Sequence, residues 1–128
     1  MEYQYCDLLP PEVREQIEAA DEAWEEESGA SYQYDLSIAS GCKAGGWASW
    51  HLTDPWNLLC SECGAGFDLL IKFASAEWDG IVSWKPIEDS AADREAQAPT
   101  GLTHGRWGET RVFVCSADVT HPFQLNIQ

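Results

Sequence analysis

The residues whose types and spacing most clearly suggest chemistry form the motif Cys60-Ser61-Glu62-Cys63-Gly64. Two thiols separated by two residues, followed by a glycine that permits a tight turn, can direct both sulfurs at one point. Such an arrangement suits a metal ion with tetrahedral coordination. The motif therefore predicts half of a zinc site, with two ordinary buried thiols at a tight turn as the alternative.

The second half of the predicted site must come from elsewhere in the chain. Cys115 stands at the end of a predicted strand and is followed by Asp118 and His121. Two thiolates from the turn, a third thiolate and an imidazole would make a closed structural Cys3His set. We therefore predict that Cys60, Cys63, Cys115 and His121 bind one structural zinc ion.

Catalytic uses of the same residues fit the sequence less well. A zinc deaminase would need His-x-Glu before a Pro-Cys-x-x-Cys motif, whereas Leu52 and Thr53 follow His51. A thioredoxin-like redox pair would lie between a strand and a helix, whereas another predicted strand follows Gly64. We predict that the protein is not an enzyme; the alternative is a small zinc-dependent hydrolase or other metal enzyme that uses His51 and His104.

The composition indicates a globular, strongly acidic protein. The chain has 128 residues, of which 45% are hydrophobic, and this predicts a single domain over residues 1–128. It carries 22 acidic and 7 basic residues, a formal net charge of −15. Proteins that bind nucleic acids or anionic membranes need basic surfaces, so neither partner is expected. The charge favours either simple solubility or a basic protein partner.

The cysteines and the lack of targeting signals predict a cytoplasmic location. No apolar run approaches the roughly 20 residues that span a bilayer, and the first residues lack the basic and then apolar beginning of a secretory signal. In the cytoplasm, the 5 cysteines would serve as thiols or metal ligands rather than in disulfides.

The elements that must position these residues begin with an acidic N-terminal helix within residues 1–29. Two prolines at positions 10–11 suit a helix start, and Gly29 suits a helix end. Apolar residues recur with helical spacing, at Val13, Ile17, Ala20 and Trp24. The pattern is typical of an amphipathic helix that packs this stripe on the core and leaves its acidic face in solvent. An acidic face built for a basic partner is the alternative.

Residues 30–128 predict a β-rich core with a small antiparallel sheet, so the expected fold class is α+β. Strands are predicted from apolar alternation and apolar runs at residues 32–38, 67–74, 81–84, 111–115 and 123–127. Residues 88–101 predict an exposed loop, and Glu77-Trp78-Asp79-Gly80 predicts a hairpin turn.

Several motifs come in an order that resembles a family of uncharacterised actinobacterial proteins. The shared pattern is Lys-x-Gly-Gly-aromatic-x-x-Trp, then Cys-x-x-Cys-Gly, then Phe-x-Cys. In this chain it corresponds to Lys43–Trp50, Cys60–Gly64 and Phe113–Cys115, within a match over residues 31–128. The pattern is also similar to the wider group of programmed cell death protein 2-like proteins, whose members act as chaperones for a basic ribosomal protein. The resemblance implies a protein-binding scaffold rather than an enzyme.

Two positions differ from the pattern of these groups. Ala48 stands where the Gly-Gly-x-Pro-x-Trp pattern has proline. The distal pair lacks its second cysteine, so Asp118 or His121 would have to take its place as a metal ligand.

The charge and the resemblance together predict a non-enzymatic, zinc-stabilised module whose acidic surface binds a basic protein. Two roles fit this description: an immunity or antitoxin protein that neutralises a basic toxin, or a chaperone that escorts a ribosomal protein. Aromatic anchors and helix acids are expected to contact the partner. These residues are Trp47, Trp50, Trp56, Glu22, Glu25 and Glu26.

Overall fold

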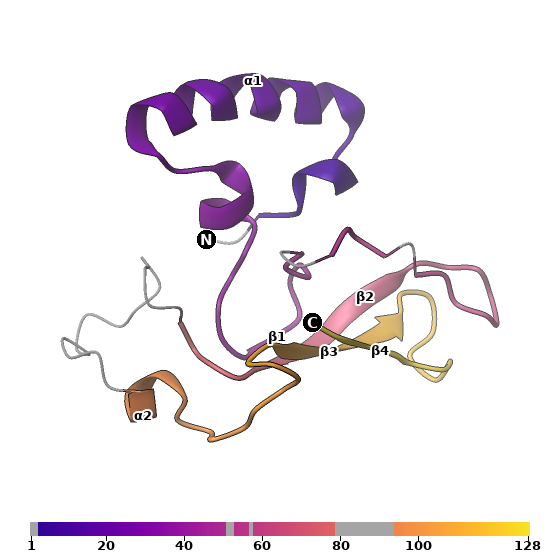
Figure 1. The fold of residues 1–128 in the computed structure, drawn as a ribbon. Coiled ribbons are helices and arrows are strands. Elements are labelled where there is room, and N and C mark those ends of the chain that lie inside the picture. The colour runs from indigo at the N-terminus through magenta and orange to yellow at the C-terminus, as the bar shows by residue number, and fades with distance from the viewer. Residues whose placement is uncertain (1–2, 51–52, 57, 79–93) are drawn as a thin grey trace. The chain divides into compact units, whose positions relative to one another are not determined.

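The computed structural model describes residues 3–50, 53–56, 58–78 and 94–128, which belong to two compact units (Figure 1). One unit, here called the helical unit, comprises Met1–Ala39 and Trp47–Trp56; the other, the sheet unit, comprises Ser40–Gly46 and Asn57–Gln128. Because the sheet unit contains a 4-stranded antiparallel sheet, the predicted α+β class is confirmed. That the whole chain acts as one domain stays a prediction.

The helical unit is built from the 3-10 turn η1 (Cys6–Leu8), the helix α1 (Pro11–Ser28) and the π-helical turn η2 (Tyr32–Leu36). Helix α1 begins with a proline, whose missing N–H costs nothing at that position. It ends where Gly29 takes a left-handed conformation at φ 72° and donates its N–H to the Glu25 carbonyl over 2.8 Å. The predicted N-terminal helix is confirmed.

The apolar stripe of α1 is only partly buried. No residue of α1 is buried, and Val13 is 39% exposed. One contact of α1 with the rest of its unit is polar, because Asp21 Oδ1 accepts the Tyr32 N–H at 2.6 Å. Ile17 and Trp24 of this stripe are half-buried, so its packing on a core stays a prediction, and α1 presents apolar as well as acidic side chains. None of the helices in the described part of the chain is long and apolar enough to cross a membrane.

The strand predicted at residues 32–38 is also wrong, because η2 forms there. Ser31 caps this turn: its hydroxyl accepts the Tyr34 N–H at 3.3 Å, and its own N–H donates to Asp35 Oδ2 at 2.7 Å. These local bonds satisfy backbone groups that a strand would satisfy only through a neighbour. Side-chain capping thus overrides the alternating pattern.

The sheet has the strand order β1-β2-β3-β4, and every neighbouring pair is antiparallel. Figure 1 labels the four strands. Its strands are β1 (Lys43–Ala44), β2 (Phe67–Ala74), β3 (Glu109–Cys115) and β4 (Gln124–Ile127). The last three confirm the strands predicted at 67–74, 111–115 and 123–127. The strand predicted at 81–84 and part of the predicted hairpin turn lie outside the described residues. Within the predicted loop at 88–101, Arg94–Gln97 form the short helix α2.

The two faces of the sheet differ in burial and in chemistry. Strand β3 alternates between buried and half-buried positions, beginning with buried Glu109. The register places Lys72 beside Arg111 on the buried face, and Leu125 beside Val112 on the other face. The buried face therefore combines charged side chains with apolar ones such as Leu69 and Phe113, while further aliphatic side chains lie on the more exposed face.

Candidate metal centre

The Cys-x-x-Cys-Gly turn leads into β2 and is held by backbone hydrogen bonds. The Cys60 N–H donates to the Ala65 carbonyl and the Gly64 N–H donates to the Cys60 carbonyl, both at 2.8 Å. Gly64 has φ 71°, which glycine adopts without strain. Just after β3, Ser116 donates its N–H and its hydroxyl to the Gly66 carbonyl at 3.0 and 2.9 Å. The turn is therefore tied both to itself and to the end of β3.

A second turn begins where β3 ends, at Cys115. The side chain of Asp118 shapes it, because Asp118 Oδ1 accepts hydrogen bonds from the Thr120 N–H and hydroxyl at 2.9 and 2.8 Å. The His121 N–H then donates to the Asp118 carbonyl at 3.1 Å. This turn carries the imidazole of His121 back towards Cys115.

Four side chains from these two turns converge on one point. The ligand atoms of Cys60, Cys63, Cys115 and His121 all lie within 4.8 Å of one another. Cys60 Sγ lies 3.5 Å from His121 Nδ1, and Cys63 Sγ lies 3.5 Å from Cys115 Sγ. In a tetrahedral site with Zn–S bonds of about 2.3 Å, the sulfurs are about 3.8 Å apart. The separations therefore fit one ion, and the structure brings together all four residues predicted as ligands.

Two of the four members of the group are shielded from solvent, and Asp118 is not part of the group. Cys60 and Cys115 are 3% and 1% exposed, and His121 is half-buried, whereas Cys63 is exposed. Asp118 Oδ2 lies 3.9 Å from His121 Nε2, the ring nitrogen that does not face Cys60. A carboxylate in that position helps to orient a metal-binding imidazole. Of the two candidates for the fourth ligand, the geometry favours His121.

The electrostatics of the group favour a thiolate at Cys115. Burial raises the pKa of the Cys115 thiol, but the N–H groups of Asp118 and Ala117 and the contacts with His121 and Cys63 lower it to about 6. The contact with Cys115 in turn raises the pKa of His121. A thiolate is the form that binds a metal ion, so the fold prepares this sulfur for coordination.

The residues predicted to contact a partner belong to the helical unit. The exposed ones are acids of α1 and two indoles: Glu22, Glu25, Glu26, Trp47 and Trp56. Trp50 is only 4% exposed, and its carbonyl accepts the Gln33 side-chain amide at 2.6 Å. The expectation that Trp50 is an exposed anchor is therefore wrong.

Of the two histidines of the enzymatic alternative, His104 is described and is not a member of the metal centre. His51 lies outside the described residues. His104 stacks on Phe73 with ring centroids 6.4 Å apart, and its Nδ1 lies 2.9 Å from Thr110 Oγ1. Phe73 and Thr110 are register partners on β2 and β3, so these contacts of His104 are with the surface of the sheet.

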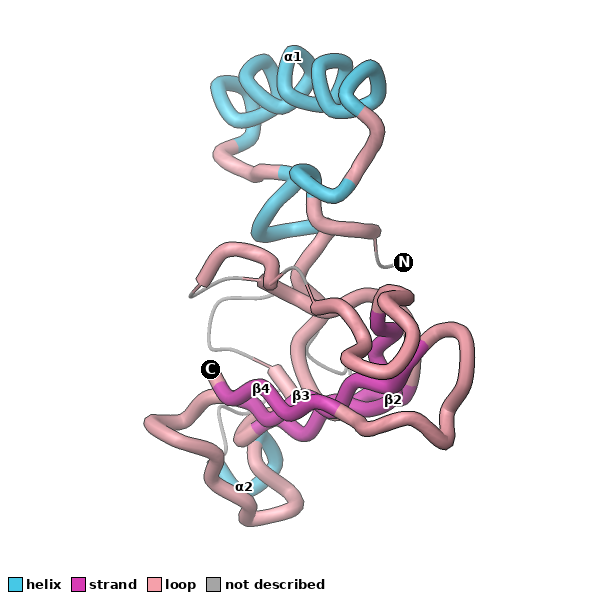
Figure 2. Tube along the Cα trace, turned by 90° about the vertical axis from the view of Figure 1, so that its right-hand side faces the viewer, coloured by secondary structure: helices cyan, strands magenta, loops and turns pink. Residues whose placement is uncertain are grey.

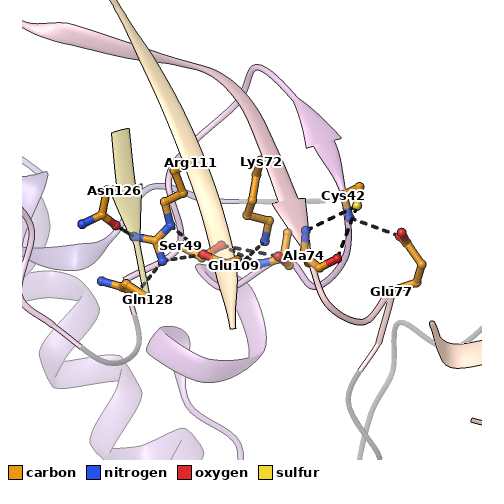
Figure 3. Close-up of polar contacts among 10 residues, drawn as sticks. Cys42, Ser49, Lys72, Ala74, Glu77, Glu109, Arg111, Asn126 and Gln128 are labelled. Carbon is orange, nitrogen blue, oxygen red and sulfur yellow. Dashed lines mark hydrogen bonds and ion pairs between the residues drawn. The ribbon is translucent and has the colours of Figure 1, made fainter. Parts of the chain in front are cut away.

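A network of buried charges that the sequence did not predict is shown in Figure 3. Glu109 lies 3.0 Å from Lys72 Nζ and accepts a 2.6 Å hydrogen bond from Arg111 Nε. Asn126 and Gln128 accept further bonds from Arg111 at 3.3 and 2.6 Å. The side chains of Lys72, Glu109 and Arg111 are 1%, 7% and 0% exposed. The sequence could have indicated this contact, because the spacing of Glu109 and Arg111 puts both side chains on one face of a strand.

A third cation, Lys43, lies next to this network. Lys43 on β1 is the register partner of Lys72 on β2. Burial, and then the Lys72 ammonium, lowers the pKa of Lys43 to about 7. The carboxylate of Glu109 acts in the opposite direction.

Comparisons with known proteins give no relative from which a function could be carried over. No family model, no curated protein and no solved structure matches this chain. The family resemblance of the sequence motifs therefore stays a prediction, and the function rests on the residues themselves.

Proposed function

We propose that this protein is a non-enzymatic binding module, stabilised by one structural zinc ion, whose acidic helical unit binds a basic protein. The observation that carries the proposal is the concentration of acidic side chains and exposed aromatic rings in one of the two units. The metal centre lies in the other unit.

The donor set supports zinc in a structural role. Three thiolates and one imidazole are ligands that zinc prefers, and four protein ligands complete a tetrahedron. A hydrolytic zinc ion needs an open position that holds a water molecule. Because Cys60, Cys63, Cys115 and His121 would occupy every position of a tetrahedral ion, the geometry favours a stabilising ion over a catalytic one.

The charge of the chain is divided unevenly between the units. The helical unit holds twelve of the 22 acidic residues and a single basic residue, Arg14. Arg14 lies 3.9 Å from Asp7 and 3.7 Å from Glu18, both exposed contacts. The sheet unit holds the other ten acidic residues together with six basic ones. A cationic protein would therefore be attracted mainly to the helical unit.

Exposed aromatic rings in the same unit supply a means of anchoring such a partner. Tyr34, Trp47 and Trp56 are 67%, 47% and 51% exposed. Complementary charge speeds the encounter of two proteins, while buried aromatic anchors contribute most of the affinity. A combination of both features is typical of a protein-binding surface.

Two biological roles share this physical basis. A module that neutralises a basic toxin and one that escorts a basic ribosomal protein would both use an acidic, aromatic surface. The chemistry of the partner is the same in the two cases, and only the identity of the captured protein separates them.

The test is to purify the tagged, zinc-loaded chain from its native cells at low salt and to identify co-purifying proteins by mass spectrometry. The binding of the purified partner is then measured against salt concentration. We expect a stoichiometric basic protein whose affinity falls steeply between about 50 mM and about 500 mM salt, because screening lengths shorten over that range. Affinity that does not change with salt would contradict the role of charge.

A matched pair of charge reversals locates the binding surface. Glu26→Lys changes an exposed acid of α1, and Asp68→Lys changes an exposed acid of β2 in the sheet unit. The two variants have the same net charge. We expect Glu26→Lys to weaken binding more than Asp68→Lys, and equal effects would show that only the overall charge matters.

A further inference from the structure

Strand β4 is an edge of the sheet (Figure 2), and it carries exposed apolar side chains. Leu125 and Ile127 are 54% and 62% exposed, and Phe123, just before the strand, is 60% exposed. Asn126 between them is 3% exposed and faces the buried network. In the part of the chain that the structure describes, no strand pairs with the outer side of β4.

The same apolar residues direct their backbone groups away from the sheet. Glu109 and Gln128 exchange hydrogen bonds of 2.8 and 3.0 Å and are therefore a hydrogen-bonded pair. In an antiparallel ladder such pairs alternate with non-hydrogen-bonded pairs. Asn126 therefore points its N–H and C=O groups towards β3, whereas Leu125 and Ile127 point theirs outward. Among the described residues, the outer edge of β4 thus has no strand partner for its donors and acceptors, which lie beside exposed aliphatic side chains.

Apart from His121, this end of a strongly acidic chain has no ionisable side chain. Residues 119–128 contain no Asp, Glu, Lys or Arg, although the chain has a formal net charge of −15. Natural proteins commonly protect an exposed edge strand with charged side chains or proline. A basic partner would find no acidic side chain on this segment, whereas a second copy would find a surface on which two acidic molecules can approach closely.

We propose that the outer edge of β4 pairs antiparallel with the same edge of a second copy of this chain. Leu125 is at the centre of the pairing and lies opposite the second copy's Leu125. Phe123 then lies opposite the second copy's Ile127. In this register Leu125 and Ile127 pair through the backbone groups that point outward. Their apolar side chains also lie on one continuous face, where cross-strand pairs stabilise a sheet. A twofold axis through Leu125 makes the interface self-complementary.

The proposed dimer differs from the proposed partner complex in its response to salt. Two copies of an acidic chain repel each other, so screening the charges is expected to strengthen dimerisation. The same screening is expected to weaken the binding of a basic protein. Either proposal can therefore fail without the other.

Sedimentation of the full, zinc-loaded chain tests the oligomeric state from roughly 1 μM to roughly 1 mM, the range of weak to moderate self-association. We expect a monomer–dimer equilibrium that shifts towards the dimer as salt is added. Leu125→Lys is expected to remain monomeric where the unmodified chain is dimeric. Leu70→Lys is the matched control, because Leu70 is 50% exposed but lies on β2, and it should still form dimers. A monomer at every concentration, or a dimer that survives Leu125→Lys, overturns the proposal.

Hydrogen exchange identifies the pairing directly. In the dimer, the amides of Leu125 and Ile127 should become protected, whereas in the monomer only inward amides such as that of Asn126 are protected. Leu125→Pro removes an outward donor and leaves the bonds to β3 in place, so it should abolish dimerisation while Asn126 stays protected. Protection of Asn126 also shows that each variant is folded. A dimer whose Leu125 and Ile127 amides exchange at the monomer rate would overturn the edge pairing.

Discussion

The sulfurs of Cys63 and Cys115 lie 3.5 Å apart although 52 positions separate the two residues in the chain. One belongs to the turn before β2 and the other ends β3, the neighbouring strand of the sheet. A metal ion bound between them would therefore fasten one end of the β2–β3 pair.

Removal of zinc is expected to destabilise the chain strongly. An ion present at about 1,000 times its Kd stabilises the folded state by about 4 kcal/mol, which corresponds to roughly 15 °C in Tm for a chain of this length. We expect one zinc ion per chain, and a decrease in Tm of this order after chelation. Metal analysis and thermal unfolding with and without chelator measure both quantities.

Substitution of a ligand provides the control for this effect. Cys115→Ser should lose stoichiometric zinc, whereas Cys42→Ser should retain it, because the Cys42 sulfur contacts the Ala74 backbone and is not in the metal group. In cobalt-substituted protein, a tetrahedral thiolate spectrum that ignores added azide would support a closed site. A spectrum that changes with azide would instead indicate an open position and favour the hydrolase alternative.

The buried charges predict a large effect of a single neutralising substitution. Glu109→Gln removes the carboxylate that contacts both Lys72 and Arg111 and leaves their charges buried without it. Breaking a buried pair in this way costs about 3–5 kcal/mol. Asp68→Asn removes the same charge from an exposed site on β2 and should change stability by less than about 0.5 kcal/mol. Urea denaturation measures both, and equal small losses would contradict the burial of the network.

The low pKa of Lys43 predicts a characteristic dependence of stability on pH. Its pKa is about 7 in the folded chain against an ordinary value of 10.5, so between these values the unfolded chain binds a proton that the folded chain does not. The contribution of Lys43 to stability therefore rises as pH rises from about 7 towards 10.5. Below pH 7 both states are protonated, and the full cost of burying the charge is present.

Lys43→Met removes this titration. We expect the variant to be more stable than the unmodified chain at about pH 6, by an amount on the order of 1–2 kcal/mol after solvent screening. We also expect the variant to lack the rise of stability with pH that Lys43 causes above about pH 7. Arg14→Met, at an exposed cation of α1, serves as the comparison. If the free energy of unfolding changed with pH in the same way for Lys43→Met and the unmodified chain, the lowered pKa of Lys43 would be refuted.

The two tryptophans Trp50 and Trp56 should separate stability from binding. Trp50 is 4% exposed and Trp56 is 51% exposed. Truncating a buried tryptophan costs about 3–5 kcal/mol, so Trp50→Ala should lower the unfolding free energy of the helical unit. Trp56→Ala should leave stability within about 0.5 kcal/mol and weaken partner binding. Calorimetric unfolding and a binding titration on both variants distinguish these outcomes.

The sequence predicted elements whose signals are local and strong. Prolines and Gly29 mark both ends of α1, and the metal tetrad was predicted because the turn motif demands further soft ligands. The strand at 32–38 was wrong, since its alternation of apolar and polar residues does not reveal that Ser31 and Asp35 cap a turn. Alternation indicates only that side chains share a face.

The polarity of the sheet faces was the least predictable feature. A strand pattern leads one to expect the aliphatic face inside, yet Lys72 and Arg111 lie on the buried face and Leu125 on the exposed one. The register that places Glu109 between the two cations depends on residues far apart in the chain. Only the assembled sheet shows that these charges compensate one another.

The position of the metal centre also has a consequence for folding kinetics. The connection between Ala74 and Glu109 must be closed before β2 and β3 can pair, and pairing between distant segments slows folding. An ion captured early by both turns would bring the ends of these strands together in advance. Strand pairing would then proceed as a local event, so zinc is expected to accelerate refolding as well as to slow unfolding.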